Sequence, residues 1–343
     1  MARARIQDVA RIADVSMSTV SAVLNGKDIV RDETKLRILK VIDQLGYRPD
    51  LYASNLARRE TRILGLIVSN LVNPFFAETA QLFEHEAHQL GYQVSLASTG
   101  FSSSQLRLSV EQMLSMRVAG LALITSEFNT RAFQMLQLSA TPSVFLDVGV
   151  PGPHISNIRV DTRKGMALAV GHLVDLGHRD ILLIRNSQKM AKEPSLLSHR
   201  YRNEGFKSVI ERFRNKGVEG HIVDVPGPGP DAGYRAIQMA LETKSFTAVV
   251  AITDMVALGA FRGINEAGLR IPQDISVVGF DNTYISEFTN PALTTINIPK
   301  GQLSKTAVEL LLGAIQDMAP GQELTLPTEL VVRGSTGPPA TTS

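Results

Sequence analysis

The 343-residue sequence has no cysteine and no tryptophan, and aromatic residues make up only 6% of it. The absence of cysteine excludes disulfide bonds, thiol nucleophiles and zinc sites built on cysteine. No apolar run approaches the roughly 20 residues that a membrane-spanning helix needs. The first residues lack the apolar core of a secretion signal. We therefore expect a cytoplasmic protein with no membrane partner.

The sequence also has little net charge, since 35 Lys and Arg nearly balance 33 Asp and Glu to leave a formal charge of +2. Its distribution is uneven: residues 1–62 hold 12 Lys and Arg against 8 Asp and Glu, a net +4, and the remainder holds 23 against 25, a net −2. This distribution is expected of a basic module attached to a neutral one, but the excess of +4 is modest, and basic ends are common on proteins that have no DNA partner. A chain of this length suits two or three domains.

The basic segment contains three short helical patterns. The first covers residues 7–13, the second follows a tight turn at residues 14–15 with Ser16 placed to cap it, and the third covers residues 32–45 and ends at Gly46. The apolar residues expected in the small core are Val9, Ala10, Ala13, Val20, Val23, Leu24, Leu36, Leu39, Ile42 and Leu45. Two short helices joined by so brief a turn match a helix-turn-helix, although the periodicity fits any small helical bundle equally well.

The second helix carries an uncharged outer face. Opposite its apolar stripe, the expected surface residues are Met17, Ser18, Ser21, Ala22 and Asn25. A helix that faces only water usually carries Lys and Glu, whereas hydroxyls and an amide suit phosphate oxygens and base edges. This helix therefore predicts DNA binding.

Further motifs make this interpretation specific. The segments Asp8–Ala10, Val15–Asn25, Gly46–Pro49 and Leu56–Ala57 together resemble the LacI/GalR family of bacterial transcriptional regulators. The resemblance extends over essentially the whole chain. It implies a ligand-responsive repressor that binds a pseudopalindromic operator as a homodimer, with one helix-turn-helix for each half-site.

The resemblance also implies roles for individual residues. Phosphate contacts are expected from Ser16, Thr19, Ser21, Asn25, Thr34 and Tyr47, and base-edge contacts from Met17 and Ser18. Residues 50–58 resemble the family's hinge helix, which brings Ala53 and Leu56 to the minor groove, where Leu56 wedges into a base step. Ala22 stands where the family usually has an arginine that reads guanine, so a methyl contact is the most that we expect there. Asp50 replaces the usual asparagine.

The rest of the chain alternates apolar strands with helical stretches, which predicts parallel sheets flanked by helices. The expected strands are Leu64–Val68, Val94–Ala97, Gly120–Ile124, Val144–Leu146, Ile181–Ile184, Ala248–Ala251 and Ser276–Phe280. The resulting fold class is a small all-α helix-turn-helix domain followed by a two-subdomain α/β effector domain that resembles periplasmic sugar-binding proteins.

The expected domain boundaries follow these patterns. The helix-turn-helix domain takes residues 1–48, the hinge and linker 49–62, the effector domain 63–336, and a disordered tail, beginning within the Gly-Pro-rich run after Gly334, takes 337–343. Within the effector domain, one subdomain is expected at about 63–162 and 293–324, and the other at about 163–292 and 325–336. Segment 291–296 is expected to belong to the hinge between them.

Ligands of open α/β sheets bind beyond the carboxyl ends of the strands, so the residues that follow strands are the candidates for effector binding. We expect Phe75 to stack on the ligand, with Phe76 packing under its helix, and polar contacts from Asp147, Asp161 and Arg202, the last because it resembles the family's ligand-binding arginine. Asp254 and Asp281 complete the set. Asp254 is also placed to cap the following helix, and capping is the role we favour for it, whereas we favour ligand contact for Asp281.

Two other classes of protein share some of these features. A transport protein of the solute-binding type would explain the body but not the basic helical segment, and an architectural DNA-binding protein would not need a ligand cleft. No nucleophile motif, metal site or cofactor motif is evident, so no enzymatic activity and no cofactor are expected. The effector is expected to be a sugar or sugar derivative, with a purine as the alternative.

Overall fold

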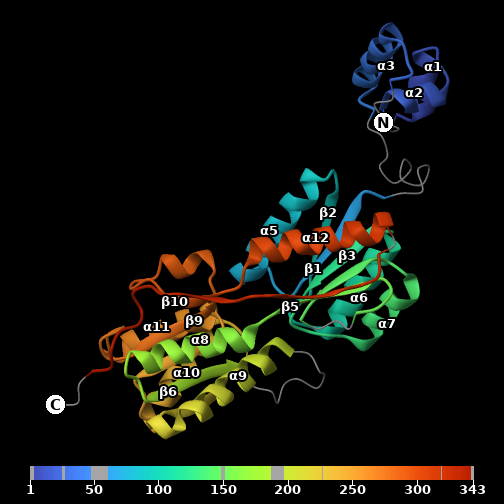
Figure 1. Ribbon diagram of the computed structural model, residues 1–343. Helices are drawn as coiled ribbons and strands as arrows, with labels where there is room; N and C mark the ends of the chain where they lie inside the picture. The colour runs from blue at the N-terminus through green and yellow to red at the C-terminus, as the bar shows by residue number, and fades with distance from the viewer. Residues whose placement is uncertain are drawn as a thin grey trace. The chain divides into compact units, whose positions relative to one another are not determined.

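The computed structural model forms two compact units, Met1–Thr61 and Arg62–Ser343 (Figure 1). It describes residues 4–24, 28–47, 61–147, 151–186, 197–225, 227–317 and 319–340. Within those ranges, no helix combines the length and the apolar character needed to cross a membrane.

The first unit holds three helices, as the sequence predicts: α1 (Ile6–Ile12), α2 (Met17–Leu24) and α3 (Asp32–Leu45). The Ser16 hydroxyl caps α2 by accepting the Thr19 N–H at 3.1 Å. Gly46 ends α3 in the left-handed conformation, with φ 56°. Both helix ends therefore follow from the local sequence.

The apolar face expected for α3 is partly wrong. Leu36 and Leu39 are 68% and 45% exposed, whereas Ile38 and Val41 are buried against α1 and α2. The buried positions 38 and 41 and the partly buried positions 42 and 45 follow the i, i+3, i+4, i+7 spacing of one helical stripe. Leu36 and Leu39 lie outside that stripe and face solvent.

The second unit contains two six-stranded sheets, each of which builds one lobe. The sheet of the first lobe is entirely parallel, in the order β11-β5-β4-β3-β1-β2. Its elements are β1 (Ile63–Val68), α5 (Pro74–Gln89), β2 (Gln93–Ser98), α6 (Ser103–Ser115), β3 (Gly120–Ile124), α7 (Thr130–Ser139), β4 (Ser143–Leu146), β5 (Ile155–Val160), α12 (Lys300–Asp317) and β11 (Glu323–Leu326).

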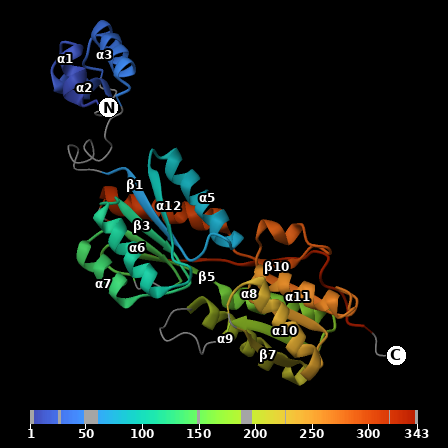
Figure 2. The same ribbon diagram turned by 180° about the vertical axis from the view of Figure 1, so that it is seen from behind.

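Both faces of this sheet are covered by helices (Figures 1 and 2). Leu64 and Leu66 of β1 belong to the same buried cluster as Phe83 of α5, whereas Ile67 belongs to a second cluster with Leu106 of α6. Neighbouring residues of a strand point to opposite faces, so an apolar strand such as β1 serves two cores.

The sheet of the second lobe has the order β12-β10-β9-β8-β6-β7 and is parallel except for β12, which pairs antiparallel with β10. Its elements are α8 (Thr162–Asp175), β6 (Asp180–Asn186), α9 (Leu197–Phe213), η2 (Arg214–Lys216), β7 (Glu219–Val225), α10 (Pro230–Thr243), β8 (Ala248–Ala251), α11 (Asp254–Glu266), β9 (Ser276–Asp281), η3 (Tyr284–Glu287), β10 (Thr294–Asn297) and β12 (Glu329–Val331). All seven predicted strands are present in the two sheets.

The chain crosses between the lobes three times, from β5 to α8, from β10 to α12 and from β11 to β12. The two later crossings lie a few residues beyond the approximate boundaries expected from the sequence. The return to the first lobe lies after Asn297 and not at residue 293, because β10 completes the second sheet beside β9. The final crossing lies after Leu326, not after residue 324, because β11 pairs with β5 along its whole length.

The segment 334–340 is not the disordered tail that its composition suggests. The Val277 N–H donates to the Ser335 carbonyl at 2.9 Å, and the Gly337 N–H donates to the Ser276 hydroxyl at 3.0 Å. The buried His178 contacts the Gly337 carbonyl through Nε2 at 2.9 Å. Hydrogen bonds from the backbone of this segment to Ser276, Val277 and His178 of the second lobe thus order a Gly- and Pro-rich sequence.

Candidate functional site

The outer face of α2 is the candidate DNA-binding surface. Met17 is 49% exposed, Ser18 is exposed, and Thr19 and Ser21 are half-buried. The Ser16 hydroxyl lies 2.7 Å from that of Ser18 and 2.8 Å from that of Thr19, so three hydroxyls are held together at the start of the helix.

Other residues expected at this surface have different positions. Ala22 is only 7% exposed, so its methyl group offers little surface to DNA. Thr34 and Tyr47 are half-buried. Asn25, Asp50, Ala53 and Leu56 lie outside the described residues.

The candidate effector site begins at the carboxyl end of β4. Asp147 adopts a left-handed conformation, with φ 59°, and its carboxylate accepts the Val160 N–H at 2.8 Å. The side chain therefore fixes the backbone where the chain first crosses between the lobes. Burial raises the pKa of Asp147 to about 6, although the nearby positive charges of Arg202 and Arg159 oppose this shift.

A cavity of about 260 Å³ lies at this crossing. It is lined by Asp147, Arg159, Val160, Asp161, Thr162, Arg163, Tyr201 and Thr325. Asp161 caps α8 by accepting the Lys164 N–H at 3.0 Å, and Arg159 donates to the Tyr201 hydroxyl at 3.3 Å. The lining offers carboxylates, guanidinium groups and a phenol ring, which suit a small molecule with several hydroxyl groups.

Arg202 approaches the same region from α9. It is 5% exposed and donates to the Ile252 carbonyl and, at 3.3 Å, to Asp281 Oδ1. Its guanidinium carbon lies 4.0 Å from the centre of the Phe280 ring. The buried Nε atom has no hydrogen-bond partner among the described residues, so this group retains an unused donor.

Asp281 follows β9 with an unusual backbone, at φ 117°, and Asn282 follows at φ 50°. Burial raises the pKa of the Asp281 carboxyl well above its ordinary value, and the charge of Arg202 acts against that shift. The lysine ammonium of Lys300 donates to the carbonyls of Asp281 and Asn282, at 3.1 and 2.6 Å. We call residues 281–284 the 281–284 loop.

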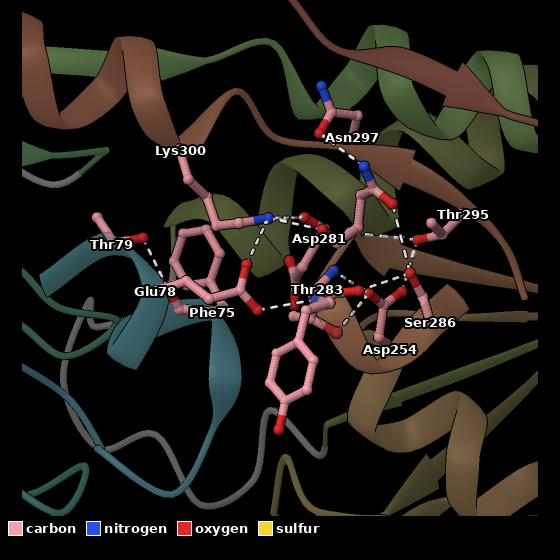
Figure 3. Close-up of polar contacts among 12 residues, drawn as sticks. Phe75, Glu78, Thr79, Asp254, Asp281, Thr283, Ser286, Thr295, Asn297 and Lys300 are labelled. Carbon is pink, nitrogen blue, oxygen red and sulfur yellow. Dashed lines mark hydrogen bonds and ion pairs between the residues drawn. The ribbon is translucent and has the colours of Figure 1, made fainter. Parts of the chain in front are cut away.

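Asp254 does not cap α11, contrary to the role favoured from the sequence. Thr253 is the cap, because its hydroxyl accepts the Val256 N–H at 3.2 Å. The Asp254 carboxylate instead accepts the Thr283 N–H at 2.7 Å and the Thr295 hydroxyl at 2.5 Å (Figure 3). Burial raises its pKa. Asp254 thus stabilises the 281–284 loop by accepting a hydrogen bond from its backbone.

The distinction expected between Phe75 and Phe76 is not seen. The two rings are 6% and 4% exposed, and they meet edge to face with their centres 5.1 Å apart. Both belong to the core of the first lobe.

Four residues of this region were not singled out from the sequence: Arg159, Tyr201, Glu78 and Lys300. Tyr201 directly precedes Arg202 in the same helix, so the resemblance that indicated Arg202 could also have indicated Tyr201. Glu78 and Lys300 are far apart in the chain, yet Glu78 Oε2 lies 3.3 Å from Lys300 Nζ (Figure 3). Nothing in the local sequence distinguishes them from ordinary surface charges.

Comparison with known proteins identifies the family. Residues 5–50 match the family model of bacterial regulatory proteins of the lacI family, and residues 170–336 match that of the periplasmic binding protein-like domain. The ribose operon repressor of Haemophilus influenzae is 34% identical over 315 residues, which cover 92% of each chain. The chain belongs to the LacI family. The transcriptional repressor PurR of Pasteurella multocida is 32% identical, over 97% of this chain and 98% of that protein.

Solved structures of LacI-family proteins have the same architecture. The lac repressor dimer bound to operator and the anti-inducer ONPF superposes with a TM-score of 0.83 at 30% identity, covering 98% of this chain and 100% of that one. A LacI-family regulator from Enterococcus faecium with bound ribose gives 0.69 at 29% identity, over 80% and 99%. The chain is therefore a ligand-responsive, DNA-binding transcriptional regulator of the repressor type.

Proposed function

We propose that this LacI-family regulator is a cytoplasmic homodimer that binds a two-fold-related operator, and that a monosaccharide held between its lobes sets its operator affinity. One observation carries the effector part. The cavity at the first crossing is lined by side chains of both lobes, among them Asp147 and Arg159 of the first lobe and Arg163 and Tyr201 of the second. A small ligand held there meets a carboxylate of the first lobe and a guanidinium group of the second, which suits a molecule with hydroxyl groups on opposite sides.

The proposed effector contacts are Arg202, Asp281, Asp147 and Asp161, with Phe75 as a neighbouring apolar wall. Of these residues, Asp147 and Asp161 line the cavity of about 260 Å³, which is smaller than the roughly 300–1,000 Å³ usual for drug-sized ligands and so favours a single sugar ring. Two relatives support the choice: the ribose operon repressor by its name, and the Enterococcus faecium regulator by its bound ribose. We therefore take D-ribose as the first probe.

For the operator, the proposed contacts are those of the α2 face and the hinge segment. Met17 and Ser18 are proposed to read base edges, and the phosphate contacts are proposed for Ser16, Thr19, Ser21, Asn25, Thr34 and Tyr47. The exposed Met17 and the three hydroxyls at the start of α2 support this assignment, because short polar side chains allow close approach to DNA. The hinge residues Ala53 and Leu56 are proposed to enter the minor groove.

The test uses the full chain with an operator selected from random-sequence DNA. Operator affinity is measured by fluorescence anisotropy with and without D-ribose, for the wild type and for Arg202→Met and Arg202→Lys. Arg200→Met is the matched control, because Arg200 lies two residues earlier in α9 but is exposed and paired with Glu204. D-ribose should alter the affinity of the wild type and the control, but not that of Arg202→Met; an unchanged response in Arg202→Met refutes the assignment.

A purine effector is the second candidate, because several relatives are PurR repressors with 31–33% identity. The same assay with purine bases separates the two. A response to a purine and none to D-ribose would identify a purine as the effector and would not alter the proposed DNA-binding function.

A further inference from the structure

The 281–284 loop begins with an unusual backbone conformation. Asp281 has φ 117°, outside the left-handed α region that the next residue, Asn282, adopts at φ 50°. Residues of this kind keep such conformations only where the surroundings hold them, and they concentrate at functional sites. The contacts that hold this loop are therefore informative.

From the first lobe, two side chains hold it. Lys300 Nζ donates to the carbonyls of Asp281 and Asn282, and Glu78 Oε1 accepts the Tyr284 N–H at 2.9 Å. Glu78 Oε2 also pairs with Lys300 Nζ at 3.3 Å (Figure 3). We call Glu78 and Lys300 the clamp, because together they bind both sides of a loop that belongs to the second lobe.

The position of Lys300 is costly for its own helix. It is the first residue of α12, where a positive charge is unfavourable next to the positive end of the helix dipole, and it is only 9% exposed. Burial of an ammonium also needs compensation by hydrogen bonds. Two carbonyls and a carboxylate supply it, so the lysine serves the loop and not the helix.

The loop held by the clamp carries the candidate ligand residue. The carbonyl of Asp281 accepts from Lys300 in the first lobe, while its carboxylate accepts from Arg202 in the second. A ligand that changes the Arg202–Asp281 contact therefore moves a residue that the first lobe grips directly. Coupling between two states requires such a differential contact.

We propose that the Glu78–Lys300 clamp transmits effector occupancy at Arg202 and Asp281 to the arrangement of the two lobes, and so to operator affinity. The inference rests on the proposed function. It assigns Glu78 and Lys300 as positioning residues that set the size of the allosteric response.

The test compares Lys300→Met and Glu78→Gln with the wild type in the full chain. Lys300→Met keeps the length of the side chain and removes its donors, whereas Glu78→Gln keeps an acceptor for the Tyr284 N–H and removes the charge. Lys305→Met and Glu309→Gln are the matched controls, because Lys305 and Glu309 form an exposed ion pair on the same helix, with Nζ and Oε1 3.9 Å apart.

Three quantities are measured: the Kd for D-ribose by calorimetry, the operator Kd without D-ribose, and the ratio of operator Kd values with and without it. Allosteric ratios are typically about 5- to 150-fold. In Lys300→Met the ratio should fall to about 1–2 while the Kd for D-ribose changes by less than about fivefold. Glu78→Gln should keep an intermediate ratio, and the two controls should match the wild type. A wild-type ratio in Lys300→Met overturns the proposal.

Failure of the proposed function has a different signature. If D-ribose does not bind the wild type, the assignment of a sugar effector is wrong. The clamp is then tested by measurements on the protein without ligand. The clamp then predicts an operator Kd that differs by at least about fivefold between Lys300→Met and Lys305→Met. It also predicts faster hydrogen exchange at the Tyr284 amide in Lys300→Met. Equal operator Kd values in these two variants overturn it, even where the melting temperature falls.

Discussion

Nη2 of Arg202 and Oδ1 of Asp281 lie 3.3 Å apart in an ion pair whose side chains are only 6% and 5% exposed. Both charges are shielded from solvent, so each is stabilised by the other, and Arg202 also donates to the Ile252 carbonyl. Breaking a buried pair from one side leaves an uncompensated charge, which costs more than the pair itself contributes. The same dependence makes the pair sensitive to any ligand that replaces one partner.

Removing the arginine alone should therefore destabilise the fold more than removing both charges. We expect Arg202→Met to lower the free energy of unfolding by about 3–5 kcal/mol at pH 8. The double variant Arg202→Met with Asp281→Asn should lose less, because no buried carboxylate remains. Urea unfolding measures both; equal losses in the single and double variants would contradict this account of the pair.

Asp147 should leave a trace in the pH dependence of stability. Its pKa is raised from 3.8 to about 6, so between these values the folded state holds a proton that the unfolded state releases. Its contribution to stability is present at low pH and is lost as the pH rises through about 6. We take the free energy of unfolding of the wild type minus that of Asp147→Asn. This difference should fall by about 3 kcal/mol between about pH 4 and 6.5 and stay constant above that range. Parallel pH profiles would count against it.

The contact between α10 and α11 should tolerate no added methyl group. A Cβ on Gly259 would lie 1.8 Å from the Pro230 carbonyl oxygen, a backbone atom that has no room to move. Gly259→Ala should cost at least about 3 kcal/mol. Gly313→Ala, in α12, is the control: its Cβ would meet nothing within 4 Å, so it should gain about 0.5–1 kcal/mol. Thermal unfolding that shows the two variants alike would refute the packing argument.

Leu56 allows a test of the hinge by DNA shape. If its side chain wedges into a central base step, Leu56→Ala should weaken binding to the selected operator and reduce the bend in it. The bend is measured by energy transfer between dyes at the two ends of the DNA. A variant that bends the operator as the wild type does would remove the wedge from the mechanism.

Much of the fold was predictable because it follows from local patterns. The apolar runs that became β1, β3 and β8 are long enough and regular enough to specify buried strands, and Ser16 and Gly46 mark helix ends by their own chemistry. The order of segments 334–340 was not predictable, because it comes from hydrogen bonds to residues such as Ser276, about 60 positions earlier.

The site was predictable only where a strand end or a motif pointed to it. Asp281 and Arg202 were found in that way, and they form a contact. Asp254 follows a strand and precedes a helix, but its role depends on the Thr283 N–H and the Thr295 hydroxyl, which the fold alone brings to it. Glu78 and Lys300 carry no local signal, because a charged residue in a helix is expected to face solvent until its neighbours in the fold are known.

The positions of β11 and β12 near the end of the chain have a consequence for folding during synthesis. β11 completes the first lobe beside β5, and β12 completes the second beside β10, yet both lie within residues 323–331. While the ribosome is still making α12, each lobe has an open sheet edge that is ready to pair with another chain. The nascent regulator should therefore be most prone to aggregation just before residue 323 emerges, and a chaperone that shields β5 and β10 at that stage would protect both lobes at once.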